Sequence, residues 1–146
     1  MDETVPHGFL RLARGGPFLA ALGALYYRKV EDGRFVIAMR VTAEHTNVHG
    51  IAHGGMLATL ADSALGLSLS LASEGRQSYV TVNLTTDFAD AAHPGDWIEA
   101  PVDIQRVGRR FAFANCFLTV GEKRILRASG VFAVMPPLNG ADLAQG

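Results

Sequence analysis

The spacing of apolar residues predicts six strands in this chain of 146 residues. The clearest case is the segment 34–41, where Phe35, Ile37 and Met39 fall on one face with the period of two that is typical of a strand. Turn residues such as Asp32-Gly33 separate the apolar segments. The six expected strands are residues 24–30, 34–41, 79–88, 97–107, 111–120 and 124–135.

A different pattern occupies the middle of the chain. Residues 56–72 are apolar on nearly every side of a helix, whereas a surface helix would show a polar face. Residues 42–55, just before it, are rich in His, Asn and Gly and are expected to form a loop. We therefore expect an α+β fold in which a curved antiparallel sheet of about six strands wraps one long buried helix.

Length and composition indicate a single domain over residues 1–146, with a helical segment at 1–23 and a loose tail at 137–146. A net charge of −1 offers no basic surface for nucleic acid. The helix is at the short limit for a membrane span and contains a carboxylate, so no membrane association is expected. The single Cys116 is consistent with a reducing compartment, and a cytoplasmic location is expected.

Asp62 is the one carboxylate in the apolar helix. It lies about two turns after Gly55, too far along to cap the helix or to interact with its positive end. Because a buried, unpaired carboxylate is costly, a specific role must retain it. We favour a general base or nucleophile over a structural acceptor at a helix–helix contact. The small neighbours Ala58 and Gly66 leave room beside it for a ligand.

His53-Gly54-Gly55 precedes the helix. The glycines would let a ligand approach the backbone, where the first N–H groups of a helix can stabilise a negatively charged oxygen. Tight packing of the loop is an equally open explanation. A single helix keeps Gly54 on the order of 12 Å from Asp62, so one chain cannot apply both groups to one reaction. Two antiparallel helices from two copies can, and a homodimer is therefore expected.

The remaining polar residues carry weaker signals. The Asn47 amide could orient water or a carbonyl, or could brace its loop. His45, His49 and His53 recur at every fourth position, but the intervening glycines argue against a helix, so no metal site is expected. Thr81 is expected on the polar face of its strand, opposite the face of Leu84. A cluster of arginines at a predicted hairpin could hold phosphates or be ordinary surface charge; it comprises Arg106, Arg109 and Arg110.

The pattern Asn47-x-x-Gly50-x-x-His53-Gly54-Gly55 is followed by Asp62 and by the strand YVTVNLTTDF. Over residues 26–135 the chain resembles the hotdog-fold acyl-CoA thioesterases, and most closely their phenylacetate-pathway (PaaI-like) branch within the 4-hydroxybenzoyl-CoA thioesterase superfamily. The resemblance implies hydrolysis of an acyl-CoA or aroyl-CoA to a carboxylic acid and coenzyme A. It also implies a dimer, or a dimer of dimers, and no cofactor beyond the coenzyme A of the substrate.

The resemblance assigns roles to five positions. Asp62 would activate water or attack the thioester carbonyl, and the backbone N–H of Gly54 would polarise that carbonyl. Asn47 and His53 would position water and thioester, and Thr81 would assist from the same subunit as the acid. The expected substrate contacts are Gly55, Ala58, Arg106, Arg109 and Arg110.

Two other functions remain as alternatives. A non-catalytic acyl-CoA-binding dimer would use the same pocket, but it has no need for a carboxylate beside the thioester. A hotdog hydratase or dehydratase would carry His-Asp or His-Glu motifs of a different pattern, which the sequence lacks.

Overall fold

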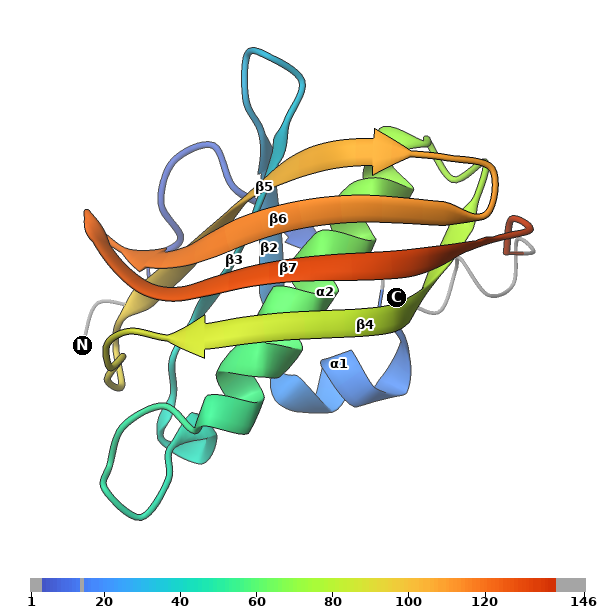
Figure 1. The fold of residues 1–146 in the computed structure, drawn as a ribbon. Helices are drawn as coiled ribbons and strands as arrows, with labels where there is room; N and C mark the ends of the chain where they lie inside the picture. Colours follow the sequence, from blue (N-terminus) through green and yellow to red (C-terminus); the bar gives the residue numbers. More distant parts are fainter. Residues whose placement is uncertain (1–3, 14, 139–146) are drawn as a thin grey trace.

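The computed structural model describes residues 4–13 and 15–138, in which one antiparallel sheet wraps around a long helix (Figure 1). The sheet has seven strands in the order β1-β2-β3-β5-β6-β7-β4. The strands are β1 (Leu10–Leu12), β2 (Leu25–Lys29), β3 (Phe35–Arg40), β4 (Ser78–Phe88), β5 (Trp97–Val107), β6 (Phe111–Val120) and β7 (Lys123–Met135). The helices are α1 (Gly16–Leu22), the 3-10 turn η1 (Ala43–His45) and α2 (Gly54–Ala72). The expected α+β architecture is confirmed.

The core lies between the sheet and one face of α2. Burying apolar side chains there removes them from water and drives the packing of the two layers. Gly130 on β7 allows the close approach, because a Cβ at this position would lie 2.7 Å from the ring of Phe132 and 3.0 Å from Leu65. The buried residues of α2 are Met56, Leu57, Leu60, Ala61, Ala64, Leu65, Ser68 and Leu69.

The expectation that α2 is buried on every side is wrong for the single chain. The face that carries Ala58, Asp62 and Gly66 is only partly buried, because the sheet covers the opposite face. By length and composition α2 could cross a membrane, a property that core helices share, and here it packs against strands β3 to β7. The Asp62 carboxylate therefore lies on a face of the helix that is only partly buried in the single chain.

The N-terminal segment differs from the helical turns expected over residues 1–23. Within its described part, 4–13 and 15–23, only α1 is helical, whereas β1 extends the sheet as a seventh strand, with Leu10 opposite Tyr27 and Leu12 opposite Leu25. Pairing with an exposed strand edge satisfies backbone groups that a short isolated helix would leave open. The tail expected to be loose, 137–146, lies mostly outside the described residues.

The alternation expected along β4 is interrupted by a bulge. The register with β7 shifts between Thr81 and Asn83, so Val82 is an extra residue without a partner. Thr81 therefore faces α2, on the same side as Leu84, instead of the opposite side. Strict alternation of side chains along the sequence cannot predict the bulge, and one inserted residue exchanges the two faces of a strand.

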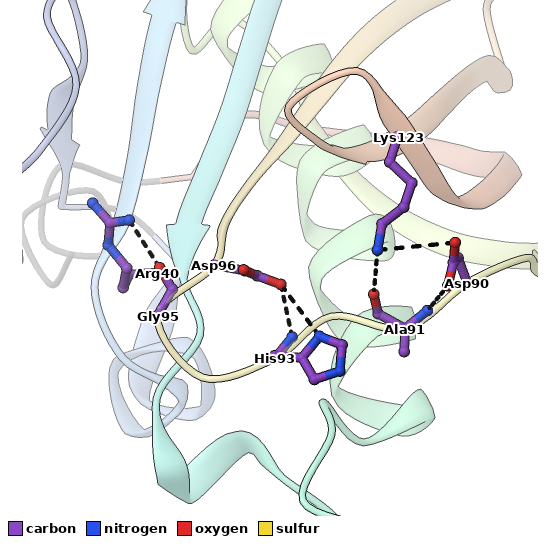
Figure 2. A network of polar contacts seen from close by, with 7 residues as sticks. All are labelled: Arg40, Asp90, Ala91, His93, Gly95, Asp96 and Lys123. Atoms are coloured by element: carbon purple, nitrogen blue, oxygen red, sulfur yellow. Dashed lines mark hydrogen bonds and ion pairs between the residues drawn. The ribbon is translucent and has the colours of Figure 1, made fainter.

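The loop between β4 and β5 supports the start of α2. Figure 2 shows Arg40 of β3 and Lys123 of β7 donating to carbonyls of this loop, at 3.0 and 3.2 Å. Between these two attachments, the carbonyl of the buried Ala92 accepts the N–H of Ala52 at 2.8 Å. The segment that leads into α2 is thus anchored on the sheet.

Candidate active site

The hydroxyl of Thr81 donates a hydrogen bond to Oδ1 of Asp62, with an oxygen–oxygen distance of 2.6 Å. The bond joins the middle of α2 to the edge strand β4. It satisfies one carboxylate oxygen and orients the other, Oδ2, away from the shared bond. A carboxylate held in this way can accept a proton from water or attack an electrophilic carbon.

The Asp62–Thr81 pair lines a cavity of ≈ 850 Å³ between α1, α2 and β4. Ala58 and Gly66, one turn before and after Asp62, line the same cavity. Its walls are mixed: small and hydroxyl-bearing residues lie on α2, and apolar residues come from α1, β4 and β7. The apolar wall residues include Pro17, Phe18, Leu19, Leu84 and Phe132. The cavity can hold an apolar group with its polar end at the carboxylate.

His53 caps the start of α2. Its Nδ1 accepts the backbone N–H of Gly55 at 2.8 Å, so the neutral ring carries its proton on Nε2. The cap gives the backbone N–H groups of the two glycines different roles. The N–H of Gly55 is used within the chain, whereas the N–H of Gly54 has no hydrogen-bond partner among the described residues. Gly54 is therefore the donor at the positive helix end that a ligand oxygen can use.

The glycines also differ in their packing. A Cβ on Gly55 would lie 3.1 Å from the ring of His53, tighter than nine in ten real Cβ contacts, so the capping ring would have to shift to admit it. A Cβ on Gly54 would lie 3.5 Å from the ring of Phe88, an ordinary contact. Packing thus accounts for Gly55 but not for Gly54.

Asn47 braces its own loop in the single chain. Its Oδ1 accepts the N–H of His49 at 2.9 Å and that of Ile51 at 3.4 Å, and its backbone N–H donates to the carbonyl of Ile51 at 2.8 Å. These bonds hold Asn47 half-buried at the base of the loop, four residues before Ile51. The oxygen is occupied by the loop, which leaves the amide NH₂ as the group able to donate to a ligand.

The two halves of the expected site lie apart in one chain. Gly54 packs beside Phe88 at one end of β4, while Asp62 bonds to Thr81, seven residues earlier on that strand. Because Gly54 and Asp62 both belong to α2, the eight residues from one to the other span about 12 Å along the helix at 1.5 Å per residue. One chain therefore brings Asp62, Thr81 and Ala58 together, but not Gly54.

Of the three arginines expected at a hairpin, Arg109 and Arg110 lie in the turn between β5 and β6. Arg106 lies near the end of β5, and all three are exposed. The backbone N–H of Val134 donates to the carbonyl of Arg110 at 2.9 Å, and Ser78 pairs with the neighbouring Met135. Arg106, Arg109 and Arg110 thus belong to the end of the sheet where β4 begins. They do not line the cavity of Asp62.

The three loop histidines have separate environments. His45 is buried and hydrogen-bonded on both ring nitrogens, whereas His49 and His53 are exposed. Within residues 4–13 and 15–138, no group of three His, Cys, Asp or Glu side chains is placed to hold a metal ion.

Sequence reasoning missed the contribution of α1 and of Tyr79 to the cavity. The phenol of Tyr79 donates to Gln77 at 3.0 Å, and burial raises the pKa of this phenol, so it remains a donor at neutral pH. Nothing in the local pattern connects α1 to the site, because the contact spans about forty residues of sequence and depends on the fold.

The chain is similar in sequence to known thioesterases and esterases. A sequence model described as Thioesterase superfamily matches residues 49–126. The putative esterase PA0474 of Pseudomonas aeruginosa is 42% identical over 129 residues, covering 88% of this chain and 96% of that protein. The acyl-coenzyme A thioesterase PaaI of Escherichia coli is 31% identical over 81 residues, 56% of each chain.

Solved structures show the same fold. The structure of the E. coli PaaI protein from the phenylacetic acid degradation operon matches with a TM-score of 0.72 and 26% identity, over 82% of this chain and 85% of that chain. A hypothetical thioesterase protein with coenzyme A from Streptococcus pneumoniae TIGR4 matches with a TM-score of 0.69 and 25% identity, over 79% and 91% of the two chains.

Proposed function

Because this chain belongs to the thioesterase superfamily, as a PaaI-like thioester hydrolase with the hotdog fold, we propose that it hydrolyses an acyl-CoA or aroyl-CoA to the carboxylic acid and coenzyme A. The observation that carries the proposal is the Thr81–Asp62 hydrogen bond of 2.6 Å at the wall of a cavity large enough for an acyl group. The names of PaaI and of the coenzyme A-bound neighbour support this substrate class.

Asp62 acts on the thioester carbonyl either as a general base on water or as a nucleophile. Thr81 fixes the carboxylate, so that Oδ2 faces the reacting atom. The oxygen of the carbonyl gains negative charge as the tetrahedral species forms, and a backbone N–H at the start of a helix stabilises that charge. Gly54 supplies this donor, while Asn47 and His53 position the thioester and water around it. The reaction needs no separate cofactor.

The site is completed by a second copy of the chain. β4 is an edge strand of eleven residues whose Val80 and Val82 are 55% and 56% exposed, and such an edge readily pairs with another strand. Antiparallel pairing of two β4 strands about a two-fold axis places the Phe88 end of one beside the Ser78 end of the other. Gly54 of the partner subunit then approaches Asp62. We propose this dimer, with dimers pairing further into tetramers.

The same pairing gives the hairpin arginines a role. They lie at the Ser78 end of the sheet, where the start of the partner's helix would arrive. Coenzyme A extends away from the thioester, and its phosphates would reach the guanidinium groups of Arg106, Arg109 and Arg110. A cytoplasmic location, where acyl-CoA is available, belongs to the same proposal and is compatible with the free thiol of Cys116.

Release of free thiol from a panel of acyl-CoAs tests the function. The wild type should hydrolyse at least one member, and Asp62→Asn should reduce kcat by about 100-fold or more, the scale of a lost general base. Binding of a non-hydrolysable thioether analogue should survive in the variant, because the cavity is unchanged in shape.

Two outcomes would overturn the proposal. A wild type that binds the analogue but hydrolyses no acyl-CoA would be a binding protein and not an enzyme. An Asp62→Asn variant with full activity would show that this carboxylate is not the catalytic group.

A further inference from the structure

The helix α1 forms one wall of the cavity but is weakly attached by packing. None of its seven residues is fully buried, and Phe18 is 71% exposed. Only Leu19 and Leu22 make partial contact with the core. A helix this short is not stable by itself, so specific contacts must fix its position.

His45 provides a polar attachment for the C-terminal end of α1. The residue is 7% exposed, and its ring lies between two backbone groups. The backbone N–H of Thr42 donates to Nδ1 at 2.9 Å, which places the proton of the neutral ring on Nε2. That Nε2–H donates to the carbonyl of Leu22, the last residue of α1, at 2.6 Å. The imidazole thus connects α1 to the turn η1.

The backbone of the same residue fixes the start of α2. The carbonyl of His45 accepts the N–H of His53 at 2.8 Å, and Thr46 pairs with Ala52 in the adjacent bridge. His53 is the residue that caps α2 and precedes Gly54. One residue therefore holds both the wall of the cavity and the first turn of the helix that carries the proposed oxyanion donor.

We propose that His45 is a positioning residue for acyl-group selection: it holds α1 as a wall of the cavity, in register with the start of α2. The inference rests on the proposed function, since the group that contacts α1 is the acyl chain of the substrate. His45 itself does not line the cavity, so its effect is transmitted through the carbonyl of Leu22. Long or bulky acyl groups reach α1, whereas an acetyl group does not.

Two substitutions separate the two ring contacts. In His45→Asn the amide oxygen can replace Nδ1 as the acceptor for Thr42, but no donor reaches Leu22. In His45→Gln the amide NH₂ can replace Nε2 and keep the bond to Leu22. We expect His45→Asn to raise KM for a long-chain acyl-CoA about tenfold, the scale of one lost hydrogen bond. The KM of His45→Asn for acetyl-CoA and its kcat for both substrates should stay within about twofold of the wild-type values. His45→Gln should have a wild-type KM for the long-chain substrate.

Amide hydrogen exchange gives a readout that does not need catalysis. His45→Asn should speed exchange in residues 16–22 about tenfold while leaving residues 60–69 of α2 unchanged, and His45→Gln should resemble the wild type. A purely structural role would lower kcat/KM equally for acetyl and long-chain substrates, or would make the two variants alike. Either result, or unchanged exchange in α1 of His45→Asn, overturns the inference.

The two proposals fail in different ways. A wild type that releases thiol from no acyl-CoA refutes the proposed function, whereas exchange in α1 still reports whether His45 holds the helix. An active wild type with an unchanged acyl preference in His45→Asn refutes the positioning role alone.

Discussion

Thr81 on the edge strand and Asp62 in the middle of α2 share a hydrogen bond of 2.6 Å, although a bulge must intervene for Thr81 to face the helix. The bulge at Val82 shifts the register so that a threonine expected on the outer face lies on the inner one. The contact fixes one carboxylate oxygen and leaves the other available.

Thr81→Val should lower kcat by about 10- to 100-fold, because a hydrogen bond to a charged group is worth about 1.5–3 kcal/mol. Valine preserves the shape of threonine but not the donor. Thr81→Ser keeps the hydroxyl and should retain most of the activity. Steady-state thiol release measures both variants; equal loss in Thr81→Ser and Thr81→Val would show that the hydroxyl is not what matters.

Gly54→Ala and Gly55→Ala should separate catalysis from stability. Alanine favours a helix over glycine by about 1 kcal/mol, and a Cβ on Gly54 meets only an ordinary contact, so Gly54→Ala should unfold at or above the wild-type temperature. Its methyl group crowds the free N–H, and kcat/KM should fall at least about tenfold. Gly55→Ala displaces the His53 cap, worth about 1 kcal/mol, and should unfold at a lower temperature than Gly54→Ala.

Thermal unfolding and thiol release on the same preparations provide the comparison. A Gly54→Ala variant with full activity would remove this N–H from the mechanism. A Gly55→Ala variant more stable than Gly54→Ala would show that the His53 cap contributes nothing.

Charges on the β4 edge should break the dimer. The double substitution Val80→Lys and Val82→Lys places like charges beside each other across a two-fold axis, which opposes strand pairing. We expect the variant to sediment as a monomer and to lose at least about tenfold in activity, because Gly54 of the partner subunit is removed. Leu10→Lys, on the opposite edge of the sheet and 61% exposed, is the matched control and should change neither property. A doubly charged variant that stays dimeric and active would place the interface elsewhere.

Replacing the hairpin arginines should weaken binding of coenzyme A without slowing the chemistry. The triple change to alanine at 106, 109 and 110 should raise KM for an acyl-CoA about tenfold, with kcat unchanged, since charge-assisted bonds to phosphate are lost. KM for the corresponding acyl-pantetheine, which lacks the nucleotide, should not move. Arg127→Ala, which removes an exposed arginine paired with Asp87 at 2.7 Å, is the control. Equal effects on both substrates would exclude phosphate binding by this hairpin.

Cys116 should be inert in the native protein. Burial raises the pKa of its thiol to about 12, so the thiolate that reacts with alkylating agents is nearly absent at pH 8. In the unfolded chain the pKa returns to about 8.5. Unfolding therefore releases protons from this thiol at high pH, and its contribution to stability is complete below about pH 8.5 and declines as the pH rises towards 12. Alkylation by iodoacetamide at pH 8, with and without denaturant, measures this; rapid labelling of the native protein would contradict it.

The sequence by itself determined the elements that depend on local chemistry. Six strands lie where the apolar spacing and turn residues predicted them, with β5 and β6 beginning and ending at the expected residues. The apolar run determined α2, and Asp62 stood out because a carboxylate in that run has no local explanation. These features follow from periodicity and from the cost of burying polar groups, both of which are properties of neighbouring residues.

The tertiary structure decided which segments and side chains contact one another. β1 forms because the edge of β2 is open to it, and α1 joins the cavity because His45 and the core hold it there. The bulge at Val82 turns Thr81 towards Asp62, and the alternation of residues along β4 does not predict this orientation. The roles of Gly54 and Gly55 separate only when the His53 ring occupies one N–H. Each of these depends on contacts between segments distant in sequence, whose energies local patterns do not contain.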